Sequence, residues 1–254
     1  MPISLHEKKI LITREESQAK EFTEMVRFYG GQPVEVPLLT ISCKDKPESK
    51  QLLTNLNKYE WLFFTSANGV NCFFQLVKKY KIDWAVFQTM KMAVVGHKTE
   101  AALKGFGFTA SFMPTTYNAD VMANEFLNRE TGKIPVLLVR GNRSREVLPA
   151  RFSKYGLPYD LLEVYDTSYN YQMKHRLNDI LKNGNIDYIT FTSPSTVEAF
   201  WEMATAESRI PCACIGTTTE LRARELGFNS VITPQEFTID ELIASLSNYI
   251  TERG

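Results

Sequence analysis

The fold is decided by a stretch that the chain carries twice, first as Trp61-Leu-Phe-Phe-Thr-Ser-Ala-Asn-Gly-Val70 and again as Tyr188-Ile-Thr-Phe-Thr-Ser-Pro-Ser-Thr-Val197. In each copy an apolar run ends in a Thr-Ser pair, and a stretch of helical composition follows. A short, continuous apolar run is typical of a strand that is buried on both faces of a sheet. The pattern therefore indicates a strand, a polar turn and a helix, present twice.

Matches on either side extend this similarity to the whole chain. Three further pairs of segments match: 93–100 with 213–220, 107–120 with 227–240, and 9–14 with 135–140. The offset is 120 residues throughout the first two pairs, and a constant offset over separate matches indicates an internal duplication. We infer two copies, at about 8–131 and 134–254.

Strand-like and helix-like segments alternate along both copies. We expect strands over 9–13, 61–65, 92–95, 135–139, 187–191 and 211–215. We expect helices over 16–29, 68–80, 97–105, 119–130, 143–155, 194–206, 217–226 and 238–250. Apolar strands that alternate with helices predict parallel sheets covered on both faces. The predicted architecture is α/β, with two doubly wound domains whose sites lie at the carboxyl ends of the strands.

Composition excludes several classes of protein. Apolar residues make up 44% of the 254 residues and charged residues 23%, which is typical of a globular chain. Lys+Arg and Asp+Glu are 29 each, so the basic excess of a nucleic-acid-binding protein is missing. There is no apolar run of transmembrane length and no signal-like segment, so we expect a cytoplasmic protein without membrane association. The four cysteines lack the spacing of a metal site, and we expect buried, reduced thiols.

The expected turns after the strands repeat one chemistry, hydroxyls or a glycine just before a helix. Ser66 and Ser193 follow two strands, Gly96 and Gly216 follow two others, and Arg140 ends a further one. Free N–H groups at helix starts bind anions, so such turns could hold a polyanion on a protein without net charge. Helix capping explains the same residue types, and each turn alone leaves both interpretations open. Likewise, the Arg140–Arg145 segment could contact carboxylates or form a solvated first helical turn.

Other motifs of known chemistry are missing from the sequence. It contains no G-x-G-x-x-G, P-loop, H-E-x-x-H or G-x-S-x-G pattern, so a nucleotide, a metal centre and a serine-hydrolase mechanism have no support.

Taken together, the short motifs resemble those of the uroporphyrinogen-III synthase family, in order and in spacing. The segments that carry the resemblance are 12–14, 64–70, 95–99, 138–141, 164–165, 191–197 and 215–218. The resemblance implies domains that differ from the two sequence copies. Residues 1–36 would join 168–254 in one domain and 40–163 would form the other, with linkers at 37–39 and 164–167 that build a two-stranded β connection. The residues alone leave open whether the domains are exchanged in this way or contiguous.

The resemblance also implies a reaction. The family closes hydroxymethylbilane, a linear tetrapyrrole with eight carboxylates, into uroporphyrinogen III, with loss of water and inversion of ring D, and it uses no metal or organic cofactor. The expected ligand is therefore a polyanionic tetrapyrrole, the expected protein partner is hydroxymethylbilane synthase, and the expected form is a monomer. Alternatives are a non-catalytic tetrapyrrole- or anion-binding relative, and a two-domain sensor of a small organic acid.

The resemblance implies roles for single residues. Tyr165 matches the family's tyrosine on the linker strand and is the candidate acid. Substrate-binding candidates are Ser66, Gly96, Thr99, Arg140, Ser193, Gly216, Thr218 and Thr219. Glu220 stands where many members carry a small residue, and Glu100 is its partner in the first copy; both would repel an anionic substrate unless they point away from the site.

Overall fold

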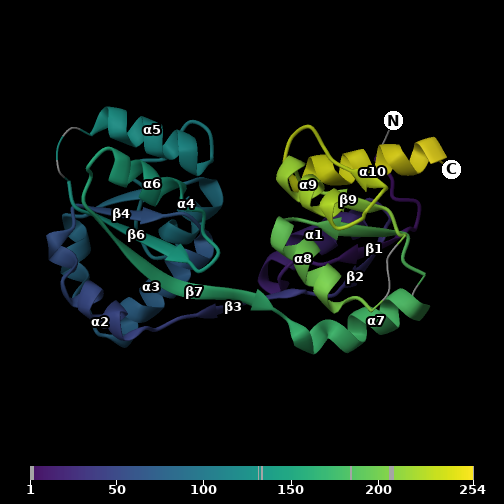
Figure 1. Ribbon diagram of the computed structural model, residues 1–254, viewed down its shortest axis with the longest axis horizontal. Helices are drawn as coiled ribbons and strands as arrows, with labels where there is room; N and C mark the ends of the chain where they lie inside the picture. Colours follow the sequence, from purple (N-terminus) through teal and green to yellow (C-terminus); the bar gives the residue numbers. More distant parts are fainter. Residues whose placement is uncertain (1–2, 131, 133, 184, 206–208, 254) are drawn as a thin grey trace. The chain divides into compact units, whose positions relative to one another are not determined.

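The computed structural model describes residues 3–130, 132, 134–183, 185–205 and 209–253. Within this part the chain forms two compact units, one made of residues up to 40 together with 168 onward, the other of residues 41–167. Figure 1 shows two strands, β3 (Leu39–Cys43) and β7 (Tyr159–Tyr169), that carry the chain across the unit boundaries as sheet neighbours. We call the discontinuous unit unit 1 and the continuous one unit 2.

Unit 1 holds a five-stranded sheet of order β10-β9-β8-β1-β2. The strands are β1 (Lys9–Ile12), β2 (Gln32–Glu35), β8 (Tyr188–Phe191), β9 (Cys212–Cys214) and β10 (Val231–Ile232), and all neighbours run parallel. Its helices are α1 (Glu16–Phe28), α7 (Lys174–Asn183), α8 (Pro194–Met203), α9 (Thr217–Glu225) and α10 (Ile239–Arg253).

Unit 2 holds the order β3-β7-β6-β4-β5, with β4 (Trp61–Phe64), β5 (Lys91–Val94) and β6 (Val136–Gly141). Its helices are α2 (Pro47–Thr54), α3 (Ala67–Lys79), α4 (His97–Lys104), α5 (Ala119–Arg129) and α6 (Val147–Lys154). A lone parallel bridge joins Ala93 to Phe112, 120 residues before the Ala213–Ile232 pair of β9 and β10. The two sheets therefore share one topology, and each is assembled from parts of both sequence copies.

Both sheets are covered on both faces, as the continuous apolar strands predict. In β4, Trp61 and Phe63 belong to one core cluster, whereas Leu62 and Phe64 belong to another, because successive side chains point to opposite faces. Figure 1 shows α5 and α6 on one side of this sheet and α3 on the other. In β1 the same alternation separates Leu11 from its two neighbours.

The expected strands and helices are present with small shifts at their ends, apart from α6 and α8. The helix expected over 143–155 begins only at Val147, because an earlier start would place Pro149 in the helix interior, where its ring clashes with the preceding turn. The helix expected over 194–206 ends at Met203, and residue 206 lies outside the described residues, as do residues 131 and 254. No helix in the described part of the chain is long and apolar enough to cross a membrane.

The expectation of four reduced thiols is wrong for one pair. Cys43 and Cys72 form a disulfide with their Cα atoms 5.2 Å apart, whereas Cys212 and Cys214 are free and buried. The bonded cysteines are 29 residues apart in the sequence, and only the course of β3 past α3 brings them together. No spacing pattern in the sequence marks such a pair.

Candidate functional site

A tyrosine–serine pair lies in unit 2 where β4 and β6 end. Ser66 follows β4, and Tyr165 of β7 lies opposite Gly141, the last residue of β6. The Tyr165 Oη atom is 3.0 Å from Ser66 Oγ, and the Tyr165 side chain is 9% exposed. The ring lies directly over Gly141, where an added Cβ would be 2.3 Å from the nearest ring carbon. Only glycine at position 141 leaves room for the ring in this place.

A β-bulge determines the direction of the Tyr165 side chain. Arg140 of β6 lies opposite Glu163 of β7, but the next residue, Gly141, lies opposite Tyr165, so the register shifts by one residue. In a regular strand Val164 and Tyr165 would point to opposite faces of the sheet. With the bulge, both belong to the same core cluster as Leu162. The irregularity therefore turns the tyrosine toward Ser66, as bulges beside functional sites often do.

The hydrogen bonds of this pair leave one proton to donate. Ser66 is the N-cap of α3, and its Oγ accepts a hydrogen bond from the Gly69 N–H at 3.0 Å. The two hydroxyls of Tyr165 and Ser66 carry two protons, and the bond between them uses one. The second proton is available for a group that approaches the pair.

The two glycine turns have the same structure in both units. Gly96 precedes α4 and Gly216 precedes α9, both with extended backbone, and neither helix has a side-chain cap at this position. The third helical residue is buried in each case, Thr99 at 4% exposure and Thr219 at 2%. Thr218, by contrast, is exposed. Of the three predicted threonines, Thr218 thus presents its hydroxyl at the surface of its unit.

An exposed aromatic ring covers each glycine. A Cβ at Gly96 would lie 3.2 Å from Tyr117, and one at Gly216 would lie 3.1 Å from the ring of Phe237. Tyr117 is 55% exposed and Phe237 58%, and they are 120 residues apart. Tyr117 also bonds to His97, with Oη 2.6 Å from Nε2. Sequence reasoning missed both rings, although the same offset that matched the glycines pairs them too.

Arg140 and Ser193 are engaged within their own units. The Arg140 side chain is buried, and its Nη2 atom donates to the Ser144 carbonyl and to Glu146, both at 2.5 Å. It thereby holds the turn between β6 and α6. Ser193 caps α8 and forms a capping box with Thr196. For Ser193, as for Ser66, the capping interpretation accounts for the residue type.

The two carboxylates beside the glycine turns are paired along their own helices. Glu100 lies 3.2 Å from Lys104, and Glu220 lies 2.8 Å from Arg224. Each negative charge is therefore balanced by a cation one helical turn further on. In the described residues, no group of three or more His, Cys, Asp or Glu side chains could hold a metal ion.

Comparisons with known proteins place this geometry in a family. The family model of uroporphyrinogen-III synthase HemD matches residues 20–244. A uroporphyrinogen-III synthase from Chlorobaculum parvum is 28% identical over 91% of this chain and 94% of that protein. A porphyrin biosynthesis protein HemD from Ruminiclostridium josui is also 28% identical, over 94% of this chain, which spans only 48% of that longer protein.

Solved structures show the same fold. The uroporphyrinogen-III synthetase of Helicobacter pylori covers 97% of this chain and all of its own, with a TM-score of 0.67 at 18% identity. A mutant uroporphyrinogen III synthase from Thermus thermophilus covers 96% of this chain and 98% of its own, with a TM-score of 0.65 at 16% identity.

Fold and site together define an internally duplicated α/β protein with polar turns at the carboxyl ends of two parallel sheets. With a family match that covers most of its length, the chain belongs to the uroporphyrinogen-III synthase family.

Proposed function

We propose that this chain is a uroporphyrinogen-III synthase, a cyclising lyase of haem biosynthesis that converts hydroxymethylbilane into uroporphyrinogen III. The observation that carries the proposal is the family match over residues 20–244. The tyrosine–serine pair and the two glycine turns, which that stretch includes, supply groups suited to the chemistry.

The first step needs an acid, and the Tyr165–Ser66 pair offers one. The terminal hydroxyl of the substrate leaves as water when it receives a proton, and the carbon that loses it becomes a cation stabilised by the adjacent pyrrole nitrogen. A phenol keeps its own proton at neutral pH and can give it up to a leaving oxygen. Ser66 holds the Tyr165 oxygen in place, and the pair retains the one donatable proton that this step uses.

The glycine turns supply donors for carboxylates. Because no side chain caps α4 or α9, N–H groups of the first turn of each helix suit an anion. Thr218 adds an exposed hydroxyl in unit 1. The rings of Tyr117 and Phe237 flank these donors and offer flat apolar surfaces to pyrrole rings.

The enzyme is proposed to act in the cytoplasm as a monomer. Its substrate is unstable toward spontaneous closure, so receiving it from hydroxymethylbilane synthase would shorten its free lifetime.

An isomer assay tests the proposal directly. Hydroxymethylbilane is supplied with and without the protein, the products are oxidised, and the type I and type III isomers are separated. Spontaneous closure gives type I, so we expect type III to appear only with the protein. Type I alone, at the rate of the protein-free control, would identify a non-catalytic relative.

A further inference from the structure

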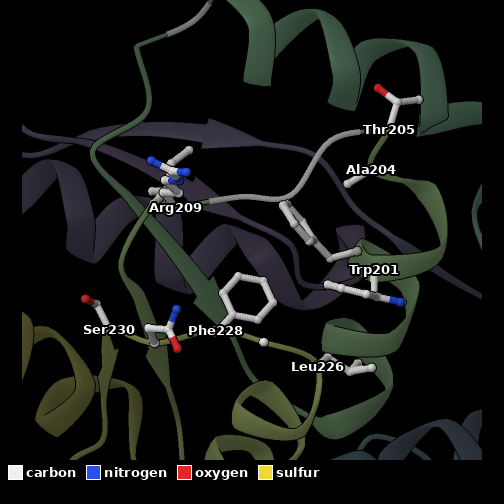
Figure 2. Close-up of a pocket in the computed structure, with 11 residues that line it drawn as sticks. Trp201, Ala204, Thr205, Arg209, Leu226, Phe228 and Ser230 are labelled. Atoms are coloured by element: carbon white, nitrogen blue, oxygen red, sulfur yellow. The ribbon is translucent and has the colours of Figure 1, made fainter.

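Unit 1 contains a cavity at the opposite end of its sheet from the glycine turn. Its volume is about 790 Å³, and it is lined by residues that precede β9 and β10, together with the end of α8. Gly216, by contrast, follows β9. Figure 2 shows Trp201 of α8 and Phe228 of the segment before β10 on neighbouring walls. The volume is within the range of small-molecule sites.

The internal duplication provides a reference for this cavity. Helices α3 and α8 begin 127 residues apart, so Phe74 of unit 2 corresponds to Trp201 of unit 1. The neighbouring pairs confirm the match: Phe64 and Phe73 lie 5.4 Å apart at 76°, and Phe191 and Phe200 lie 5.6 Å apart at 77°. The offset of 120 residues pairs Phe108 with Phe228.

In unit 2 a tryptophan of the chain itself occupies the equivalent place. The Trp84 ring stacks on Phe74 at 5.5 Å and 13°, and on Phe108 at 5.9 Å and 4°. It comes from a short 3-10 helix, Trp84–Gln88, between α3 and β5. Phe74 is fully buried, and the rings of Phe87, Phe106 and Phe108 contact it in addition to Trp84.

Unit 1 lacks the segment that would supply such a ring. The offset between the copies falls from 127 at Trp201 to 120 at Cys212, so seven residues are missing from the connection between α8 and β9. Trp201 is 47% exposed, and it pairs with no aromatic ring in the described part of the chain. Among the residues that the structure describes, the same position is thus filled by a ring in unit 2 and by none in unit 1.

We propose that this cavity binds a planar aromatic or heteroaromatic small molecule, whose ring takes the place that Trp84 occupies in unit 2. Trp201 and Phe228 supply the flat walls, and stacked aromatic pairs are favourable beyond their buried area. Thr205, Asn229 and Ser230 at the cavity can bond to polar substituents of the ring. Within unit 1 the cavity and the Gly216 turn lie at opposite ends of the sheet, and the inference does not depend on the proposed function.

The three tryptophans of the chain allow a direct test with 5-fluoroindole as the probe. In ¹H–¹⁵N spectra the indole N–H of Trp201 reports on the cavity. The indole N–H of Trp84 reports on the corresponding place in unit 2, which the Trp84 ring itself fills, and that of Trp61 reports on the buried core of unit 2. Titration should shift the Trp201 signal in a saturable way and leave the Trp61 signal unmoved. A Trp201 signal that stays in place up to the solubility limit of the probe would overturn the proposal.

Variants locate the binding by fluorine NMR of the probe. Trp201→Ala should weaken binding about tenfold, the effect of losing roughly 1.4 kcal/mol of stacking and contact. Trp84→Ala should open the equivalent place in unit 2 and double the number of bound probes, as engineered apolar cavities bind aromatic molecules. Unchanged affinity in Trp201→Ala, with dispersed Trp61 and Trp84 signals as proof of folding, would place the probe elsewhere and refute the site.

Discussion

The Tyr165 hydroxyl carries the chemical part of the proposed function. Tyr165→Phe keeps the ring over Gly141 and removes only the hydroxyl and its bond to Ser66. We expect the rate of type III formation to fall by about 10- to 1000-fold, the span that loss of an acid gives when water substitutes in part. The melting temperature should change little, and the type I background should rise.

A second phenol on the same strand serves as the control. Tyr159 Oη lies 2.9 Å from Ser153 Oγ, so Tyr159→Phe removes a tyrosine–serine hydrogen bond of similar geometry. This variant should keep both rate and isomer ratio. If Tyr165→Phe behaved like Tyr159→Phe, the tyrosine would be a packing residue and another group would have to protonate the leaving hydroxyl.

Gly141 is expected to position the tyrosine rather than to touch the substrate. In Gly141→Ala the new Cβ would overlap the Tyr165 ring, so the ring must move and its bond to Ser66 must lengthen or break. We expect a loss of stability of about 1–3 kcal/mol, typical of overpacking, together with a reduced rate. Denaturant unfolding and the isomer assay measure the two effects.

A double variant separates positioning from general damage. If Gly141 acts only through the Tyr165 hydroxyl, Gly141→Ala combined with Tyr165→Phe should be no slower than Tyr165→Phe alone. Rate losses that multiply in the double variant would show that Gly141→Ala harms the site by another route.

At the scale of elements, six strands were predictable because their apolar runs are continuous and their ends carry polar turns, whereas β2 and β10 were not predicted. The composition of 143–155 predicts a longer helix than α6, because composition alone does not register the limit that Pro149 sets on the helix start. Two helices, α2 and α7, were not predicted. In α2 only Ser49 and Leu53 are buried, so its apolar periodicity is weak. In α7, by contrast, Leu177, Ile180 and Leu181 stand at helical spacing and pack in the core of unit 1, so this helix could have been predicted from the sequence.

The site was predictable only in part, for a different reason. Tyr165 and the glycine turns lie in motifs, but the bulge that turns Tyr165 depends on how β7 pairs with β6, and a single sequence does not record register. The same holds for the Cys43–Cys72 disulfide, which depends on the course of β3. The covering rings Tyr117 and Phe237 could have been found from the repeat alone.

The segment that follows β3 is joined to β7 by charge. Glu163 bonds to Lys46 at 2.7 Å and lies 3.6 Å from Lys44. The bond from Lys46 holds the pKa of Glu163 below its ordinary value of 4.5. A carboxyl whose pKa is lowered by folding stabilises the protein above its unfolded pKa, and this stabilisation is lost as the pH falls through the folded pKa.

Glu163→Gln should therefore lower the melting temperature by about 1–3 °C at neutral pH, and by progressively less as the pH falls through the lowered pKa of the native carboxyl. Thermal melts across this pH range measure the difference. Glu60→Gln removes a single exposed ion pair with Lys91 and should have a smaller effect at neutral pH. If the melting temperature of Glu163→Gln stays below that of the native protein at low pH as well, the variant loses stability through altered packing and not through the lost charge.

At the scale of the whole molecule, each of the two units combines segments of both sequence copies and has a core of its own. Unit 1 pairs strands from the start of the first copy with strands from the end of the second, and unit 2 uses what remains. Each unit has core clusters on both faces of its own sheet. Only β3 and β7 cross the unit boundary, and each core cluster contains residues of one unit alone, so we expect neither core to need the other for its packing.

We therefore predict that each unit folds alone. Residues 39–169 form unit 2 with both connecting strands complete, and they should give a cooperative thermal transition by circular dichroism. Unit 1 needs a joined chain, residues 1–40 linked to 168–254. A short Gly-Ser linker suffices, because the Thr40 and Ser168 hydroxyls are 3.0 Å apart.

Neither fragment should form the type III isomer, because Tyr165 and Ser66 belong to unit 2, whereas Gly216 and Thr218 belong to unit 1. A folded unit 2 that produced type III alone would remove the unit 1 turn from the mechanism. A fragment 39–169 without a cooperative transition would instead show that its core depends on unit 1. In that case the joining of both units in one chain would stabilise unit 2, rather than only connect it to unit 1.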